Sequence, residues 1–359
     1  MHPYQQFARR LLSGSVDHDL ALLNLVCAHG LPGARVMDIE VCLRTINSWT
    51  HKVRYYTNEL LRQYHREPSD YYSSEPYFRM LCLVTCLQRN CGVHYNLAKI
   101  SPDAVFEAAD SFIFGIVQGN GGTCATMPVV YTAIGRRLGY PLKLVDARGG
   151  DANHTFVRWD DPNGVRFNIE ATAQGMSCHP DDYYRAGLYT TTAQDERRGC
   201  FLRSMSPREE FASFLGQAFH CWKDVGNFRF AADAMATAYV LCPDNDFFRD
   251  TLNTTLSDWQ TALRNRQPNR FPEIMVESPK RRFPLAFPVE IEKQILGLEA
   301  LENMLNDKEQ DQNWWEPMRQ GRRLSKQPRE AYVKFDEYNC SIQFEFDRNG
   351  YCYDSSLLA

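Results

Sequence analysis

The chain has 359 residues, of which 44% are hydrophobic and 23% are charged, and its net charge is −4 at neutral pH. This balance is ordinary for a globular protein and excludes wholesale disorder. It provides no basic field for a phosphate backbone, so nucleic acid is excluded as an expected partner.

The first hundred residues have the pattern of a helical region. The segment from Met1 to Gln6 lacks a basic stretch followed by an apolar run, so it predicts no secretory signal. From Asp38 to Tyr64 apolar residues recur at steps of three and four, the period of an amphipathic helix. Ser74 followed by Pro76, or Ser73 one residue earlier, starts a second helix that ends near Gly92. We interpret residues 1–100 as a helical scaffold.

The pattern changes in residues 101–190. An apolar run over 112–117 leads into a glycine-rich turn that ends at Cys124. Helical spacing follows, and Gly139 with Pro141 stops that helix. Residues 142–145 resemble a strand, and residues 154–159 and 165–170 resemble the arms of a hairpin whose loop, 160–164, is rich in turn formers. These elements predict an α+β core.

Helical spacing returns in residues 195–262, where one segment resembles the end of a tetratricopeptide repeat. The matching residues are Trp222, Gly226, Ala231, Met235, Ala238 and Pro243. Phe219 stands where that pattern has a small residue, and no second copy follows, so ordinary helical packing explains the segment equally well. Residues 263–359 predict a linker, a helix from Val289 to Leu305, and strands at 332–335 and 341–346 with a turn at 347–350.

Twelve cysteines raise the question of a disulfide or metal framework, but their density is far below that of a small cross-linked scaffold. No Cys-x-x-Cys pair occurs. Cys82, Cys86 and Cys91 fall in one helical segment, and Cys178 precedes His179, yet neither group completes a zinc ligand set. We predict reduced thiols, no metal and no cofactor. No segment reaches the roughly 18 apolar residues of a membrane span, so a cytoplasmic protein with no membrane partner is expected.

Cys124 stands where a thiol can be activated. A free cysteine is mostly protonated at neutral pH, and the thiolate is the nucleophile. The glycines before Cys124 permit a tight turn, and a helix that begins at or just after it directs free amides and a positive dipole end toward the sulfur. Those amides can also stabilise an oxyanion. Gln118, six residues upstream, is a candidate second donor, although a surface glutamine in a loop is the simpler interpretation.

Strand parity predicts the partner of this thiol. If residues 160–164 form the hairpin loop, Trp159 opposes Val165 on an apolar face and His154 opposes Glu170 on the other. Directly opposed Cβ atoms are about 5 Å apart, so Glu170 can orient the His154 ring and stabilise its charged form. His179 and His220 lack an opposed acid and are interpreted as surface or packing residues.

These motifs resemble the transglutaminase-like superfamily, and most closely its bacterial branch, in which such a core is joined to helical, tetratricopeptide-like segments. The matching segments are Gly122-Thr123-Cys124-Ala125, Arg136-Arg137-Leu138-Gly139-Tyr140-Pro141, His154-Thr155-Phe156-Val157 and Phe167-Asn168-Ile169-Glu170-Ala171-Thr172. In that family the cysteine opens a helix, the histidine follows on a strand, and an acid, usually aspartate, lies on the next strand. Glutamate at position 170 lengthens the reach by a methylene, which makes Asn168 an alternative orienting residue.

The resemblance implies a Cys124-His154-Glu170 triad that acts on an amide or peptide bond through a thioester. Proteases, deamidases, cross-linking transglutaminases and acyltransferases share these parts, and fold alone cannot choose among them. Hydrolysis of a protein or peptide substrate is our first expectation, because water is always available. The rival is a catalytically idle core whose helical segments bind a protein partner.

Overall fold

The computed structural model describes residues 3–14, 19–101, 104–149, 153–162, 164–197, 199, 201–266, 285–312, 329–335, 340–346 and 352–358. Backbone contacts divide the chain into two compact units, which we call the sheet-and-helix unit (Asp17–His29 and Gly33–Glu210) and the second unit (Met1–Val16, Gly30–Pro32 and Phe211–Ala359). These boundaries differ from the four predicted regions. Most of the predicted helical region 1–100 lies in the same unit as the predicted core, residues 101–190.

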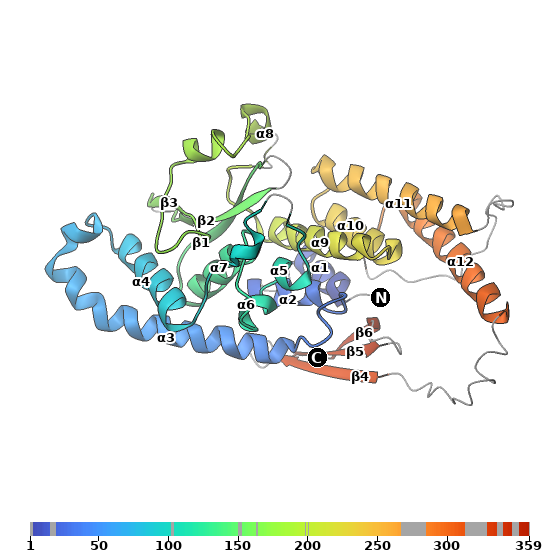
Figure 1. Cartoon of the computed structure of the whole chain (residues 1–359), viewed down its shortest axis with the longest axis horizontal. Coiled ribbons are helices and arrows are strands. Elements are labelled where there is room, and N and C mark those ends of the chain that lie inside the picture. The colour runs from blue at the N-terminus through green and yellow to red at the C-terminus, as the bar shows by residue number, and fades with distance from the viewer. Residues whose placement is uncertain are drawn as a thin grey trace. The chain divides into compact units, whose positions relative to one another are not determined.

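The sheet-and-helix unit combines helices with an antiparallel sheet, an α+β arrangement (Figure 1). Its longer helices are α2 (Leu20–Ala28), α3 (Ile39–Arg66), α4 (Glu75–Asn90) and α7 (Met127–Arg137), with α9 (Pro207–Asp224) beginning here. Its strands are β1 (Leu142–Ala147), β2 (His154–Asp160) and β3 (Arg166–Ile169). Its short helices are η1 (Pro68–Tyr71), η2 (Leu97–Lys99), α5 (Ala108–Ser111), α6 (Phe114–Val117), η3 (Asp181–Arg185) and α8 (Ala193–Arg197).

The two helices predicted in the first hundred residues are present, and each begins at a side-chain cap. Asp38 accepts a hydrogen bond from the backbone N–H of Val41 at the start of α3, and Ser74 does the same for Tyr77 at the start of α4. Capping satisfies amides that the first helical turn leaves without partners. The sequence signals therefore correctly predicted where both helices start.

Helix α7 is the central element of this unit. Every residue from Met127 to Gly135 is buried. The helix contacts β1 and β2, as well as α2, α3 and α4. Gly135 permits close packing on the sheet, because a Cβ atom there would lie 2.2 Å from Leu142 Cδ1. Arg136, in the last turn of the helix, pairs its guanidinium with the buried carboxylate of Glu210.

The sheet has the order β1-β2-β3 with both pairs antiparallel, but the predicted hairpin register is wrong by two residues. Trp159 pairs with Phe167 rather than with Val165, and Val157 pairs with Ile169. Asp160 pairs with Arg166, and next to this pair Asp161 N–H donates a hydrogen bond to the Val165 carbonyl (3.0 Å). A slip of two residues keeps every side chain on its predicted face. The nearly parallel rings of Trp159 and Phe167, with centroids 5.9 Å apart, provide an aromatic pair that the predicted register lacks.

The second unit contains the remaining helices and a second antiparallel sheet. Its elements are α1 (Pro3–Leu12), α9 from Phe211 onward, α10 (Phe228–Leu241), α11 (Asp246–Arg266), α12 (Val289–Gln312), β4 (Arg329–Phe335), β5 (Cys340–Phe346) and β6 (Cys352–Leu358). The predicted helix at 289–305 and strands at 332–335 and 341–346 are present, whereas β6 was not predicted. The predicted turn at 347–350 and most of the predicted linker, 267–284, lie outside the described residues.

The segment that resembles a tetratricopeptide repeat forms α9 and α10, which are separated by a short turn. Gly226 occupies that turn with φ of +72°, a conformation that favours glycine. Trp222 is buried and packs on Phe230, with ring centroids 4.7 Å apart. Within the described part of the chain, no helix is both long and apolar enough to cross a membrane.

Candidate active site

Cys124 lies in a turn immediately before α7 rather than within the helix. The first helical hydrogen bond already encloses it, because Met127 N–H donates to the Thr123 carbonyl at 3.0 Å. The Thr123 hydroxyl accepts from Ala125 N–H (3.1 Å) and donates to the Asp110 carbonyl (2.7 Å), and the Thr126 hydroxyl accepts from Thr123 N–H (2.9 Å). This reciprocal capping fixes the turn. Among the described residues, the backbone N–H of Cys124 has no acceptor.

Two glycines let the chain reach this turn. Gly121 has φ of +81°, in the left-handed region. At Gly122 a Cβ atom would lie 2.5 Å from Met127 Cγ and 2.8 Å from Ile116 Cδ1. Gly122 also exchanges backbone hydrogen bonds with the segment after α4, donating to the His94 carbonyl and accepting from Asn96 N–H, both at 2.8 Å. The backbone conformation therefore favours glycine at position 121, and the close packing leaves no room for a Cβ atom at position 122.

His154 and Glu170 meet on one face of the hairpin. His154 Nε2 lies 2.7 Å from Glu170 Oε2, and both side chains are largely buried, with 13% and 8% of their surfaces exposed. In the observed register Phe156 is the residue opposite Glu170, so His154 is a diagonal neighbour of the glutamate. Diagonal neighbours are about 7–8 Å apart at their Cα atoms, within reach of a long side chain. The predicted pair therefore meets even though the predicted register is wrong.

Both oxygens of Glu170 are held in place. Oε1 accepts from the backbone N–H (3.1 Å) and the hydroxyl (2.6 Å) of Thr172, and Oε2 accepts from the Tyr184 hydroxyl (3.3 Å) as well as from His154. The backbone N–H of Glu170 donates to the Ser177 carbonyl at 2.8 Å. A carboxylate fixed in this way can hold the imidazole in one orientation.

The electrostatics of the pair favour a charged histidine. Burial alone would lower the pKa of His154, but hydrogen bonds and charge interactions with Cys124 and Glu170 outweigh it and raise that pKa from 6.5 to about 9. Burial would raise the pKa of Glu170, yet its contacts with His154 and Thr172 bring it below the ordinary 4.5. Because Nε2 is committed to Glu170, Nδ1 is the ring nitrogen left to interact with Cys124. The arrangement thus favours the imidazolium form of His154 beside the Glu170 carboxylate.

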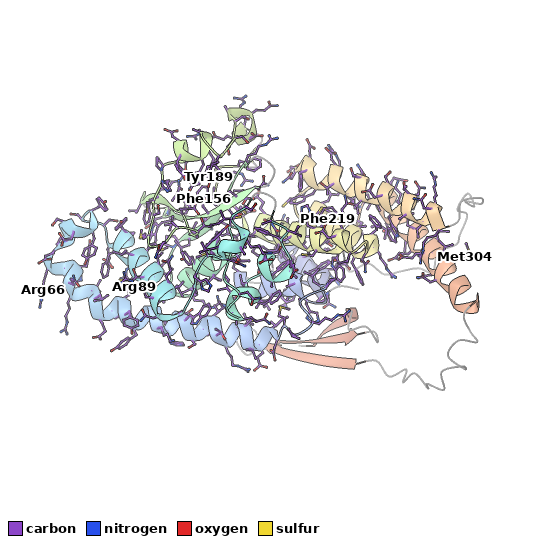
Figure 2. All side chains as sticks on the ribbon, viewed as in Figure 1. Arg66, Arg89, Phe156, Tyr189, Phe219 and Met304 are labelled. Carbon is purple, nitrogen blue, oxygen red and sulfur yellow. The ribbon has the colours of Figure 1, made fainter. Side chains whose placement is uncertain are left out.

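Aromatic rings surround this pair. The Tyr189 ring lies 5.0 Å from the His154 ring, and Tyr184 stacks on Phe156 at 4.0 Å with an interplanar angle of 7°. Phe156, on β2, and Tyr189, both labelled in Figure 2, each pack on the Tyr184 ring. Burial raises the pKa of the Tyr189 and Tyr95 phenols, and the negative charges of Glu170 and Cys124 raise it further. Tyr184 and Tyr189 thus place aromatic surface next to the His154–Glu170 pair.

Asn168, the alternative orienting residue, is occupied elsewhere. Its Oδ1 accepts from Arg158 Nε at 2.7 Å, and its Nδ2 donates to Asp181 Oδ1 (2.8 Å) and to the His179 carbonyl (3.0 Å). Arg158 is fully buried and also donates to Asp181 Oδ1 at 2.5 Å and to the Leu202 carbonyl at 3.0 Å. Asn168 therefore holds a buried arginine whose charge is balanced by Asp181, and the contacts of Asn168 do not include His154.

The other candidate residues lie apart from the pair. Gln118 is exposed, and among the described residues its side chain has no hydrogen-bond partner. The His179 ring stacks on Tyr183 at 3.9 Å and lies 3.0 Å from the Ser177 hydroxyl. His220 belongs to the second unit, where burial lowers its pKa. In the described part of the chain, no three His, Cys, Asp or Glu side chains are grouped to hold a metal ion.

Some residues of this site were not expected from sequence. Thr172 belongs to the Glu170-Ala171-Thr172 triplet, so the sequence placed it near the site. Its hydrogen bonds to Glu170 were not predicted. Tyr184 and Tyr189 come from a segment without strand or long-helix periodicity, where no local pattern indicates a contact.

Comparisons with protein-family models, with curated proteins and with solved structures found no match.

Proposed function

We propose that this protein is a cysteine-nucleophile hydrolase or acyltransferase with a transglutaminase-like core, acting on an amide or peptide bond. Cys124 is the nucleophile, His154 the acid and base, and Glu170 the orienting carboxylate. The observation that carries the proposal is the buried 2.7 Å contact between His154 and Glu170, with the other ring nitrogen left for a cysteine that precedes a helix. The sequence resemblance to the transglutaminase-like superfamily supports the same assignment.

The proposed reaction has two steps. The Cys124 thiolate attacks the substrate carbonyl, and the imidazolium of His154 donates its proton to the leaving amine as the tetrahedral intermediate collapses to a thioester. In the second step His154 removes a proton from water or from an acceptor amine, which attacks the thioester and releases Cys124. Glu170 keeps Nδ1 directed at the sulfur throughout and stabilises the charged ring.

The carbonyl oxygen of the substrate carries negative charge in the tetrahedral intermediate, so it needs hydrogen-bond donors there. The backbone N–H of Cys124, without an acceptor among the described residues, is the first donor we propose. The exposed amide of Gln118 is a candidate second donor, which substrate binding would have to draw in. Apo sites often complete such contacts only in the substrate complex.

We propose a protein or peptide substrate and no cofactor, since the chemistry needs only the three side chains and water. Hydrolysis is favoured over amine transfer, because amine transfer requires a second site for the acceptor. The helical segments are candidates for binding the protein that carries the scissile bond.

The test is capture of the acyl enzyme. The full chain is mixed with a p-nitrophenyl ester, and the burst of p-nitrophenol is followed together with the mass of the Cys124 peptide. A stoichiometric burst with an acyl group on Cys124, absent in Cys124→Ser and His154→Ala but present in the matched control Cys178→Ser, supports the proposal. Absence of both burst and adduct in the folded wild type would instead indicate an idle core that acts as an interaction module. Adding a primary amine during turnover separates transfer from hydrolysis by the product formed.

A further inference from the structure

The C-terminal end of α4 brings two cysteines together. Arg89, labelled in Figure 2, lies in the last turn of this helix. There Cys91 N–H donates to the carbonyl of Cys86, five residues back, at 3.1 Å. An α-helical bond reaches back only four residues, so this wider turn folds residue 91 over residue 86. Cys86 is buried, with 2% of its surface exposed, whereas Cys91 is only half-buried.

The two thiols are unequal. A hydrogen bond from the Cys86 thiol lowers the pKa of Cys91, the charge of Lys52 lowers it further, and partial burial opposes both. The same hydrogen bond, together with burial, raises the pKa of Cys86. The sulfur nearer to solvent is therefore the better thiolate, and its hydrogen-bond donor is a second thiol.

A surface pocket of about 480 Å³ reaches Asn90, the residue before Cys91. It is lined by Ser48, His51, Lys52, Tyr55, Tyr56 and Asn90. Lys52 is the residue whose charge acts on Cys91, and Asn90 is the neighbour of Cys91 in the chain. A small polar reagent in this pocket lies beside the Lys52 charge and one residue from the half-buried Cys91.

We propose that Cys86 and Cys91 form an oxidisable thiol pair, in which a hydroperoxide oxidises Cys91 and Cys86 closes an intramolecular disulfide. This site is separate from the proposed triad and does not depend on it. The Cys91 thiolate attacks one peroxide oxygen, the O–O bond breaks, and the leaving oxygen takes a proton to form water or an alcohol. Cys91 is then a sulfenic acid, two electrons more oxidised, and the peroxide is reduced.

The second step uses the neighbouring thiol. Cys86 attacks the sulfenic sulfur, the S–O bond breaks, and hydroxide leaves with the Cys86 proton as water. The sum is two thiols and one hydroperoxide giving one disulfide, one water and one alcohol or second water. An added dithiol such as dithiothreitol reverses the change by exchange.

Two other cysteines provide matched controls. Cys82 lies one helical turn before Cys86, is buried, and burial raises its pKa to about 11. Cys178 is exposed, yet desolvation raises its pKa to about 11 as well. Because thiolate is the reactive form, we expect Cys91 to be alkylated at least about tenfold faster than Cys178 at neutral pH.

Peptide mapping tests the disulfide directly. Trypsin cleaves after Arg79, Arg89 and Lys99, so Cys86 falls in the peptide of residues 80–89 and Cys91 in that of residues 90–99. The full-length wild type is treated with hydrogen peroxide, its remaining thiols are blocked with iodoacetamide, and the digest is run without reductant. We expect the two peptides to appear joined and to separate after dithiothreitol. Fragmentation of the joined pair distinguishes Cys86 from Cys82 without any variant.

Variants then assign the roles. Cys86→Ser should leave a sulfenic acid on Cys91 that dimedone traps, Cys91→Ser should abolish the joined peptides, and Cys82→Ser should retain them. The proposal is overturned if folded wild type yields no joined pair, if the linkage uses Cys82, or if Cys82→Ser abolishes it while circular dichroism shows a native fold. Cys124 lies in another tryptic peptide, so its own oxidation is read separately and failure here leaves the proposed triad untouched.

Discussion

Glu170 is a diagonal rather than a direct cross-strand neighbour of His154, and its carboxylate still lies 2.7 Å from the imidazole. The extra methylene of glutamate provides this reach. At a directly opposed position an aspartate would suffice. Glutamate replaces the aspartate that is usual in the transglutaminase-like superfamily, which this sequence resembles. Its longer side chain suits the register of this hairpin.

Shortening the side chain tests that relationship. We expect Glu170→Asp to lower the rate of Cys124 acylation by about 10²-fold, because withdrawing a carboxylate by about 1.5 Å misplaces the ring it orients. Glu170→Gln keeps the length but removes the charge, and loss of the orienting charge in a serine-protease triad costs on the order of 10⁴ in rate. Burst kinetics with one activated ester measure both variants. A Glu170→Asp variant of wild-type activity would contradict the diagonal geometry.

The raised pKa of His154 predicts the alkaline limb of the pH profile. Cleavage of an anilide requires the imidazolium to protonate the leaving nitrogen, so its rate should fall as pH rises through about 9, the pKa of His154. In Glu170→Gln the limb should move toward the ordinary pKa of 6.5. Acylation by a p-nitrophenyl ester needs no such proton and serves as the control. An identical limb in wild type and Glu170→Gln would show that the carboxylate does not stabilise the charged ring.

The same pair predicts how stability depends on pH. The pKa of His154 is higher in the folded state, so its stabilisation is complete below 6.5 and is lost as pH rises toward about 9. The pKa of Glu170 is lower in the folded state, so its stabilisation is present above 4.5 and is lost as pH falls further. The unfolding free energy of wild type should therefore exceed that of His154→Gln by more at pH 5.5 than at pH 9.5. Urea titrations at the two pH values measure this difference, and an equal gap at both would argue against a charged pair.

Asn168 should matter for stability rather than for rate. Asn168→Ala removes an acceptor from buried Arg158, which costs about 1–3 kcal/mol of unfolding free energy for a buried group left without a partner. Acylation should fall by less than about tenfold, equivalent to about 1.4 kcal/mol in the barrier. Urea unfolding and burst kinetics on the same preparation report both quantities. If Asn168→Ala were inactive and Glu170→Gln nearly normal, the site would be of the Cys-His-Asn type instead.

Sequence alone predicted the faces of the hairpin but not its register. Side chains alternate with a period of two, so His154 and Glu170 share a face in any register shifted by an even number of residues. The five-residue loop could equally be 160–164 or 161–165. Contacts from other segments hold β3 in the observed register, among them the hydrogen bond from Asn168 Nδ2 to Asp181 Oδ1 and the ring contact between Phe167 and Tyr77.

Helix α7 also has one end that local sequence signals predicted and one that they did not. Gly139 and Pro141 correctly indicated where α7 ends, since they are local signals. Its beginning depends on Thr123, whose hydroxyl donates to the carbonyl of Asp110 in another element. Tyr184 reaches Glu170 from a segment whose position is fixed by Arg158 and Asp181. Tertiary contacts of this kind leave no periodic trace in a single sequence.

All three proposed active-site residues lie within one stretch of chain, from Cys124 to Glu170. Their closeness in sequence affects the order in which the protein folds. Contacts between residues close in sequence form with a small loop-closure entropy, and proteins rich in them fold fast. The β2–β3 hairpin and the helix after Cys124 can therefore associate early. All three residues belong to the sheet-and-helix unit, which ends at Glu210. During synthesis, we expect Cys124 and His154, the proposed nucleophile and base, to meet before the last third of this sequence has left the ribosome.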